Sequence, residues 1–167
     1  EGRRPSLRLD KLDEQAIIRR NDRPTAPNPN TREFFNQINA ALAQSIDNDL
    51  TVYLHGANSN MAIAAGQAAQ LRHFTGRNSV VLMFAWPSAE RGMRYFTDVT
   101  NARATVSEFA KFLEFLMRNT HAEHINILAY SAGSQVLSPA LVQFRRRFLQ
   151  DRFIPLRLGE IYFAAPD

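Results

Sequence analysis

Ser131 lies in the stretch Ala129-Tyr130-Ser131-Ala132-Gly133, which directly follows the apolar run from Ile125 to Leu128. In a Gly-x-Ser-x-Gly turn between a strand and a helix, the serine hydroxyl stands above the sheet at the N-terminus of the helix, where it can act as a nucleophile. Alanine replaces the first glycine here, which adds only a methyl group, whereas Gly133 retains the second. The stretch therefore predicts a nucleophilic Ser131, with an ordinary small loop residue as the alternative.

A second stretch, His55-Gly56-Ala57-Asn58, follows the earlier apolar run from Leu50 to Leu54. Acyl transfer requires two backbone N–H groups that donate to the developing oxyanion, one from the residue after the nucleophile and one from a loop after an earlier strand. Ala132 and Ala57 occupy these two places, and a backbone donor demands little of its side chain. The loop would be supported by the other residues of the stretch, His55, Gly56 and Asn58. Taken alone, His55-Gly56 is equally well a simple turn.

Short apolar runs alternate with longer amphipathic stretches from residue 50 onward, and both faces of the runs are apolar. This alternation is typical of a parallel sheet covered by helices on both sides. The predicted buried strands are 50–54, 79–86, 124–130 and 159–165. The predicted helices between them are 60–74, a long one capped by Asp98, and 133–149. The apolar stripe of the long helix would consist of Ala102, Val106, Phe109, Phe112, Leu113 and Leu116. We therefore expect an α/β fold, a three-layer sandwich with ligand sites at the carboxyl ends of its strands.

The first thirty residues are polar and charged, and they end in Asn-Asp-Arg-Pro-Thr-Ala-Pro-Asn-Pro-Asn. The three prolines of that stretch exclude a regular element, so residues 1–30 are predicted to be an arm and a loop that precede a domain of residues 31–167. Asn30 with Glu33 can cap a helix that continues to about Ser45. Its apolar stripe would consist of Phe34, Phe35, Ile38, Leu42 and Ile46.

The composition of the 167 residues is that of one globular domain, and it excludes several classes of protein. No apolar run approaches the roughly 18 residues of a membrane-spanning helix, and the absence of cysteine excludes disulfide and thiolate chemistry. Basic residues exceed acidic ones by four, but the densest cluster, Arg145 to Arg147, is predicted to be a solvated face late in a helix. No aromatic-interleaved basic motif indicates nucleic-acid binding.

No cofactor or metal motif is evident in the sequence. His121 and His124 form a His-Ala-Glu-His stretch without the His-Glu-x-x-His spacing of a metal-binding helix and without a further ligand. The glycine patterns that bind dinucleotides or phosphates are also missing. We therefore expect neither a cofactor nor a metal, and a small molecule as the binding partner.

Four motifs, in this order and spacing, resemble the α/β-hydrolase superfamily, and within it an uncharacterised bacterial group of serine-hydrolase-like proteins. They are Tyr-Leu-His-Gly-Ala-Asn at 53–58, Phe-Ala-Trp-Pro-Ser-Ala at 84–89, Ala-Tyr-Ser-Ala-Gly-Ser at 129–134 and Ala-Ala-Pro-Asp at 164–167. The resemblance covers residues 50–167. Ala57 departs from the aromatic residue often found at that place in the group, which affects the wall of the pocket and not the backbone donor.

The resemblance implies an esterase-like or lipase-like serine hydrolase that cleaves an ester, thioester or amide. Ser131 would attack the carbonyl carbon, a histidine would take its proton, and a carboxylate would orient that histidine. Asp167 is a candidate for this acid, with a turn or cap residue, or an acid on a later strand, as the alternatives. Candidates for lining an apolar pocket, with core positions as the alternative, are Trp86, Tyr95, Phe96 and Tyr130.

The histidine of such a triad follows the serine in chain order, but the four histidines of this sequence all precede Ser131. Two explanations remain open: the sequence is the N-terminal part of a longer hydrolase, or it is a noncatalytic binding or scaffold protein on a hydrolase-like fold. Gly133 and the small oxyanion loop favour the first. We therefore expect a C-terminal part of the same protein to supply further strands and the histidine, and the 167 residues alone to be inactive.

Overall fold

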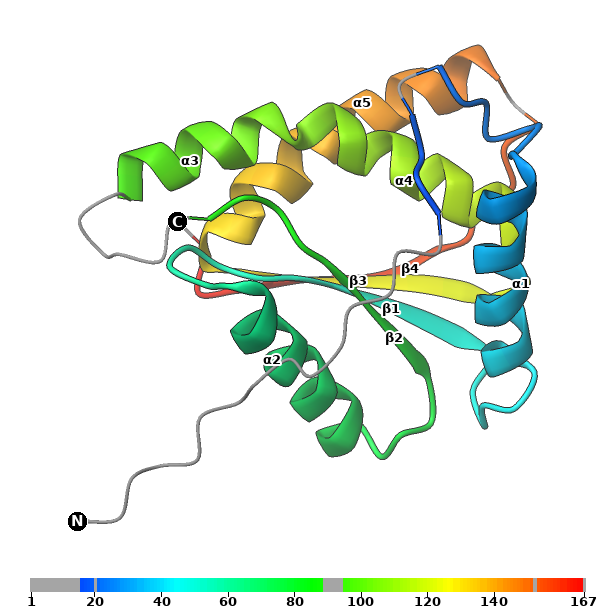
Figure 1. Cartoon of the computed structure of the whole chain (residues 1–167), viewed down its shortest axis with the longest axis horizontal. Helices are drawn as coiled ribbons and strands as arrows, with labels where there is room; N and C mark the ends of the chain where they lie inside the picture. The colour runs from blue at the N-terminus through cyan, green and yellow to red at the C-terminus, as the bar shows by residue number, and fades with distance from the viewer. Residues whose placement is uncertain (1–15, 20, 89–94, 152, 167) are drawn as a thin grey trace.

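The alternating runs form one parallel sheet with helices on both faces (Figure 1). The computed structural model describes residues 16–19, 21–88, 95–151 and 153–166, without the side chains of 95–99. Its elements in chain order are α1 (Pro29–Leu42), β1 (Asp49–Leu54), α2 (Met61–Phe74), β2 (Val80–Phe84), α3 (Tyr95–Ala104), α4 (Val106–Asn119), β3 (His124–Tyr130), a 3₁₀ turn (Ser131–Gly133), α5 (Ser134–Gln150) and β4 (Leu158–Ala164).

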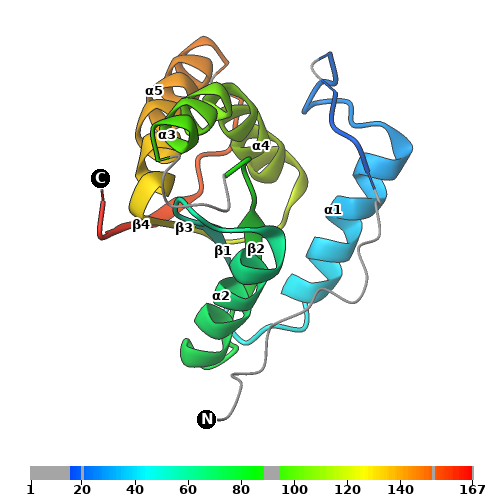
Figure 2. The same cartoon turned by 60° about the vertical axis from the view of Figure 1, so that its left-hand side comes forward.

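The strands lie in the order β2-β1-β3-β4, and every pair is parallel. Because parallel neighbours need a crossover, each connection carries at least one helix over a face of the sheet. Figure 2 shows α2 on one face and α3, α4 and α5 on the other. The predicted three-layer α/β sandwich is confirmed.

The strand register aligns the carboxyl ends of the strands along one edge. Leu54, the last residue of β1, lies opposite both Phe84 of β2 and Ala129 of β3, and Tyr130 of β3 lies opposite Ala164 of β4. The loops that follow these strands therefore meet at the same end of the sheet. This is the edge at which parallel α/β sheets bind their ligands.

The core lies between the sheet and the helices α4 and α5. The predicted stripe of α4 is buried at Val106, Phe109, Leu113 and Leu116, and the Phe109 ring packs edge-on against Phe84 of β2 at a centroid distance of 4.8 Å. Burial of each such side chain contributes about 1.5–3 kcal/mol relative to its exposed state. This packing holds the sheet against the helical layer and hence fixes the loops at the ends of its strands.

Helix α1 begins two residues earlier than the capping pattern predicted. Asn28 is the cap, and its Oδ1 accepts from the Thr31 N–H at 2.9 Å. Pro29 takes the first helical position, where its missing N–H costs nothing and its fixed φ fits the helix. The predicted Asn30–Glu33 capping box is therefore wrong. The helix ends at Leu42, so Ile46 lies outside it and is 81% exposed instead of completing the apolar stripe.

The single long helix predicted from Asp98 consists of two helices, and Asp98 lies inside the first one, α3, instead of capping it. The break is at Thr105, whose hydroxyl donates to the Asn101 carbonyl at 2.8 Å. The N–H of Thr105 also donates to the carbonyls of Asn101 and Ala102. A threonine hydroxyl that bonds the preceding turn in this way bends or interrupts a helix.

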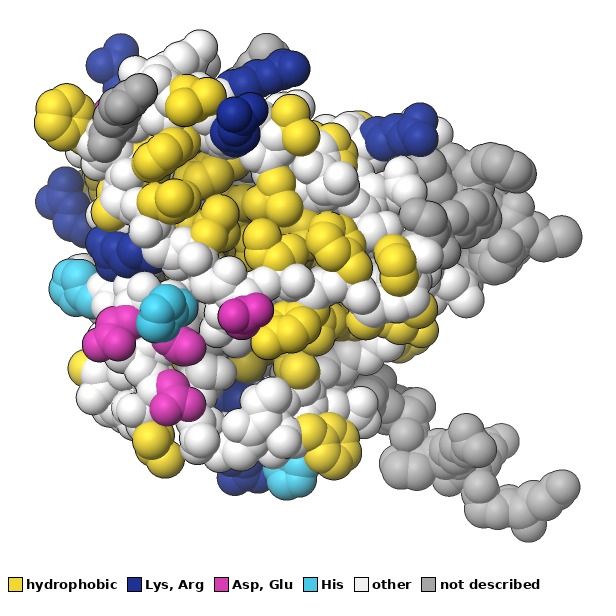
Figure 3. Space-filling model, turned by 180° about the vertical axis from the view of Figure 1, so that it is seen from behind, with side chains coloured by type: hydrophobic (Ala, Val, Ile, Leu, Met, Phe, Trp, Pro, Cys, Tyr) yellow, Lys and Arg dark blue, Asp and Glu magenta, His cyan; other side chains and the backbone are white. Residues whose placement is uncertain are grey.

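Strand β4 is an edge strand in the described chain. The prediction that it is buried is therefore wrong. Tyr162 is 52% exposed and Phe163 is 45% exposed. The run of apolar residues could not distinguish a central strand from an edge strand, because both carry the same residue types. Figure 3 shows this side of the molecule, where apolar side chains gather over a broad area.

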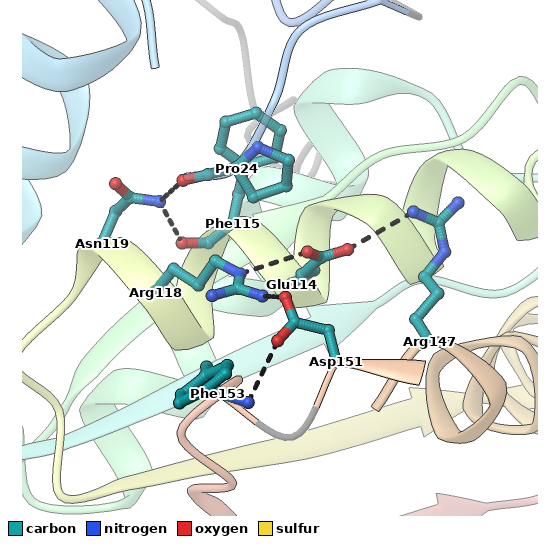
Figure 4. Close-up of polar contacts among 8 residues, drawn as sticks. All are labelled: Pro24, Glu114, Phe115, Arg118, Asn119, Arg147, Asp151 and Phe153. Atoms are coloured by element: carbon teal, nitrogen blue, oxygen red, sulfur yellow. Dashed lines mark hydrogen bonds and ion pairs between the residues drawn. The ribbon is translucent and has the colours of Figure 1, made fainter. Parts of the chain in front are cut away.

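Helix α4 also anchors the segment before α1 and the end of α5. Lys111 Nζ donates to the Arg19 carbonyl at 2.6 Å, and Asn119 Nδ2 donates to the Pro24 carbonyl at 3.0 Å, so the stretch before α1 lies against this helix. In Figure 4, Glu114 lies between the guanidinium groups of Arg118 and Arg147.

Arg118 also pairs with Asp151 at the end of α5. Of the predicted solvated face at the end of this helix, Arg145 and Arg146 are exposed, and Arg147 is half-buried through its contact with Glu114. These ion pairs fix the end of α5 against α4. Within the described ranges, no helix has the length and apolar character needed to cross a bilayer.

Candidate active site

Ser131 occupies the apex of the turn between β3 and α5. Tyr130 before it is still extended, at φ −103° and ψ 129°, and Ser131 then turns to φ +48°. A positive φ at a residue other than glycine costs of order 1–3 kcal/mol and persists only where the surrounding structure enforces it. A sharp, strained strand-to-helix turn with a half-buried serine is the local geometry that presents a nucleophile above a sheet.

Close contact between the loops after β1 and β3 holds this turn in place, and two glycines make that contact possible. A Cβ at Gly133 would lie 2.9 Å from the carbonyl oxygens of both Leu54 and His55, which are backbone atoms. A Cβ at Gly56 would lie 3.0 Å from the Ser131 Cβ and from the Tyr130 ring. The end of β1 therefore packs directly on the serine turn. A Cβ at Gly133 would force the backbone to shift, and one at Gly56 would require its neighbours to move by a few tenths of an ångström.

His55 and Trp86 join the loops after β1 and β2. The Trp86 backbone N–H donates to His55 Nε2 at 3.1 Å, and the Trp86 indole N–H donates to the His55 carbonyl at 2.9 Å. The two rings are stacked, with centroids 4.9 Å apart and planes 6° from parallel. Both residues are buried. Trp86, a candidate pocket residue by sequence, is thus a core residue beneath the loops.

The two candidate oxyanion donors belong to neighbouring loops. Ala132 follows Ser131 and is fully buried, whereas Ala57 is half-buried and packs against the edge of the core. Asn58 after it is exposed and adopts φ +55°, which turns the chain away toward the cap of α2 at Asn60. The structure therefore brings the predicted His55–Asn58 loop and the Ser131 turn together at one end of the sheet.

Tyr53 and Tyr130 extend the site on the α2 side, and sequence reasoning did not single out Tyr53. Its hydroxyl donates to Gln67 Oε1 of α2 at 2.9 Å. Burial, with a smaller contribution from the nearby Tyr130, raises the pKa of Tyr53 to about 12. Tyr130 is 43% exposed beside Ser131, so its ring is not part of the core, and its assignment as a pocket residue stays a prediction. A buried tyrosine two residues before a His-Gly turn was the available signal for Tyr53.

The four histidines lie in three different places in the fold. Both ring nitrogens of His55 make hydrogen bonds to the backbone, to Gly56 and Trp86. His73 is exposed at the end of α2 beside Arg77. His121 and His124 lie at the amino end of β3, the opposite end of the sheet, where His124 pairs with Asp49 at 2.9 Å.

Three predicted site residues cannot be placed completely. Asp167, the candidate acid, lies outside the described residues, and the side chains of the candidate pocket residues Tyr95 and Phe96 do as well. In the part of the chain that the structure describes, no group of three or more His, Cys, Asp or Glu side chains is arranged to hold a metal ion.

A parallel sheet between helical layers, with a strained serine turn at the end of a central strand, defines the class of α/β hydrolases. Residues 30–167 match the family described as "Alpha/beta hydrolase of unknown function (DUF900)", and the chain belongs to this family. No curated protein and no solved structure matches the chain.

Proposed function

We propose that the protein is a serine hydrolase that cleaves an ester, thioester or amide through an acyl-enzyme on Ser131. The observation that carries this proposal is the positive φ of Ser131 at the junction of β3 and α5. At this junction the strained serine is held by two close glycine contacts, which is the geometry of a nucleophile presented above a sheet at a helix N-terminus. The assignment to an α/β-hydrolase family supports the same chemistry.

In this reaction the Ser131 oxygen attacks the carbonyl carbon of the substrate, and the N–H groups of Ala57 and Ala132 donate to the oxyanion that forms. Collapse of the tetrahedral intermediate expels the alcohol, thiol or amine with a proton, and water then hydrolyses the acyl-enzyme by the same route. The N-terminus of α5 contributes its positive dipole end to the same oxygen. The exposed ring of Tyr130 offers an apolar surface beside the reacting carbon.

The base that activates Ser131 is a histidine outside these 167 residues, because the four histidines in the sequence are engaged or placed elsewhere. We propose that a further segment of the same protein supplies it. Asp167 stays the candidate for the acid that orients it, since it follows β4, the strand after the nucleophile helix.

Covalent labelling by a fluorophosphonate probe tests the proposal on the full-length protein. The probe transfers its phosphonyl group to an activated serine and loses fluoride, so labelling reports the nucleophile without knowledge of the substrate. We expect labelling of the wild type and none of Ser131→Ala. The isolated 167 residues should label at least 100-fold more slowly, because general base catalysis contributes 10²–10⁴-fold.

Ser134→Ala is the matched control, since Ser134 is a buried serine three residues further on, at the start of α5, and its hydroxyl makes no hydrogen bond. It should label at the wild-type rate. Labelling that survives in Ser131→Ala would exclude Ser131 as the nucleophile. A full-length protein that does not label and that still binds small esters would instead favour the noncatalytic binding protein.

A further inference from the structure

His55 is held in one tautomer by its two hydrogen bonds. The Trp86 backbone N–H can only donate, so His55 Nε2, 3.1 Å away, accepts and carries no proton. The proton of the neutral ring is therefore on Nδ1, which donates to the Gly56 carbonyl at 2.8 Å. A ring with both nitrogens bonded to the backbone in this way orients the backbone that it binds.

The bond to the Gly56 carbonyl fixes the peptide between Gly56 and Ala57. In a trans peptide, the C=O and the next N–H point in opposite directions within one plane. No cis peptide occurs in the described chain. With the Gly56 carbonyl directed at the His55 ring, the Ala57 N–H must be directed away from it. A 180° flip of this peptide would break the His55 bond and withdraw the Ala57 donor.

The surroundings keep the ring itself from moving. Trp86 stacks on it and bonds the His55 carbonyl, and that carbonyl also lies against Gly133. Gly56, on the far side of the bond, lies against the Ser131 Cβ. These contacts therefore fix the orientation of the Gly56–Ala57 peptide relative to the serine turn.

We propose that His55 is a positioning residue that presents the Ala57 N–H to the oxyanion by holding the Gly56 carbonyl, while Trp86 holds the His55 ring. This inference rests on the proposed function of Ser131. It assigns to the histidine of the loop a specific role in stabilising the transition state, distinct from the proton transfer that a triad histidine performs.

Two substitutions separate the two hydrogen bonds of His55. An asparagine amide can take the place of Nδ1 and donate to the Gly56 carbonyl, whereas a glutamine amide can take the place of Nε2 and accept from the Trp86 N–H. The full-length protein and p-nitrophenyl butyrate serve as enzyme and probe. We expect His55→Gln to lose about 100-fold in kcat with KM within threefold of wild type, since loss of an oxyanion donor costs 10²–10³ in kcat. The kcat of His55→Asn should be at least tenfold higher than that of His55→Gln.

Trp86→Phe distinguishes peptide orientation from general rigidity of the loops. It retains the backbone N–H and a stacking ring, and it removes only the indole bond to the His55 carbonyl. It should lower the thermal midpoint and reduce kcat by less than tenfold. A 100-fold loss in Trp86→Phe, or equal kcat values for His55→Asn and His55→Gln, would overturn the positioning role.

The two proposals fail in different ways. Wild-type protein that neither hydrolyses the ester nor labels with the fluorophosphonate would refute the serine hydrolase. An active wild type, an inactive Ser131→Ala and a His55→Gln variant with wild-type kcat would refute only the role of His55. If both His55 variants fail to fold, the kcat of Trp86→Phe alone decides between orientation and rigidity.

Discussion

At the scale of single residues, the geometry of the site depends on positions where a side chain is absent. Gly133 lies against two carbonyl oxygens at the end of β1, and these belong to backbone that cannot rotate away. The same contacts hold Ser131 at its positive φ, because they fix where the chain must pass between β3 and α5. The strain at Ser131 is therefore maintained by packing between two loops and not by the serine itself.

Gly133→Ala should separate the serine turn from the loop after β1. The added methyl group would lie 2.9 Å from the carbonyl oxygens of Leu54 and His55, closer than a Cβ contact allows. We expect a loss of roughly 1–3 kcal/mol in the free energy of unfolding, as for other overpacked sites, measured by urea denaturation. We also expect slower fluorophosphonate labelling of the full-length protein.

Gly76→Ala is the matched control for that change. Gly76 ends α2 at φ +78°, so alanine there costs about 1 kcal/mol through its backbone conformation and meets only the side chain of Asn78. Its labelling rate should equal that of wild type. If Gly133→Ala also labelled at the wild-type rate, the close contact would have no part in presenting Ser131.

Tyr53 should make stability depend on pH in the alkaline range. Burial raises its pKa to about 12, whereas an unfolded tyrosine titrates near 10. Below pH 10 both states hold the proton, but between pH 10 and 12 the unfolded state loses it first and then binds fewer protons than the folded state. The free energy of unfolding therefore falls with rising pH across this window, by roughly 2 kcal/mol for this group.

Urea denaturation of wild type and Tyr53→Phe at several pH values from 9 to 11.5 measures this contribution. Phenylalanine keeps the ring, removes the bond to Gln67 and has no proton to lose. The wild type should lose stability more steeply than the variant above pH 10. Parallel curves for the two proteins would contradict a buried, protonated Tyr53.

The residues of the candidate site that could be predicted from sequence are those defined by their immediate neighbours. Ser131 and Gly133 are recognisable because the turn, the preceding apolar run and the following helix are local. The bonds from Trp86 to His55 span 31 residues, and the Tyr53–Gln67 bond joins a strand to a helix. Such partners depend on how the loops meet in space, which residue types alone do not specify.

At the scale of elements, the carboxyl end of α4 holds together three parts of the chain. Asn39 of α1 donates to the Asn119 carbonyl at 3.0 Å and accepts from the His121 N–H at 2.8 Å. Asn119 in turn bonds the Pro24 carbonyl with its side chain. The Asn39 side chain thus bonds the last carbonyl of α4, which the helix leaves without a partner of its own. It also bonds the N–H of His121 in the link to β3.

Asn39→Ala should weaken the attachment of α1. Loss of the amide leaves the Asn119 carbonyl and the His121 N–H without this partner, which costs roughly 1–3 kcal/mol in unfolding free energy by urea denaturation. Asn36→Ala, three residues earlier on the exposed face of α1, is the control with the same change in helix propensity. It should alter stability by no more than about 0.5 kcal/mol. Equal losses in both variants would refute the role of Asn39.

The elements themselves followed from sequence where periodicity and caps are strong. Strands β1 to β3 and the helix α2, capped by Asn60 and ended by Gly76, lie where they were predicted. The start of α1 was missed because three neighbouring residues, Asn28, Pro29 and Asn30, offer competing start signals. The break at Thr105 was missed because the apolar stripe continues through it, from Ala102 to Val106. The bonds from Thr105 back to Asn101 and Ala102, which mark the break, leave no trace in the apolar pattern.

At the scale of the whole molecule, the β4 edge of the sheet carries a broad exposed apolar surface in the described chain. The face of β4 and the neighbouring surface of α5 carry the apolar side chains seen from behind in Figure 3. Residues of this region with a large exposed fraction are Val142, Leu149, Phe153, Leu156, Tyr162 and Phe163. An open edge strand with exposed apolar side chains is a template for pairing with another chain. In the 167-residue chain alone, this surface should therefore drive self-association.

Light scattering after gel filtration of the 167-residue chain, over a concentration series, measures this association. Tyr162→Lys places a charge in the middle of β4, where its 52% exposed side chain can reach solvent without disturbing the core. Because a lysine on an edge strand opposes pairing with a second edge, the variant should stay monomeric at concentrations where the wild-type chain associates. Ile46→Lys adds the same charge at another exposed hydrophobic residue, 81% exposed in the link before β1, and it should associate like the wild type. Association that persists in Tyr162→Lys but disappears in Ile46→Lys would place the contact near the start of β1 and leave the edge of β4 without a role in it.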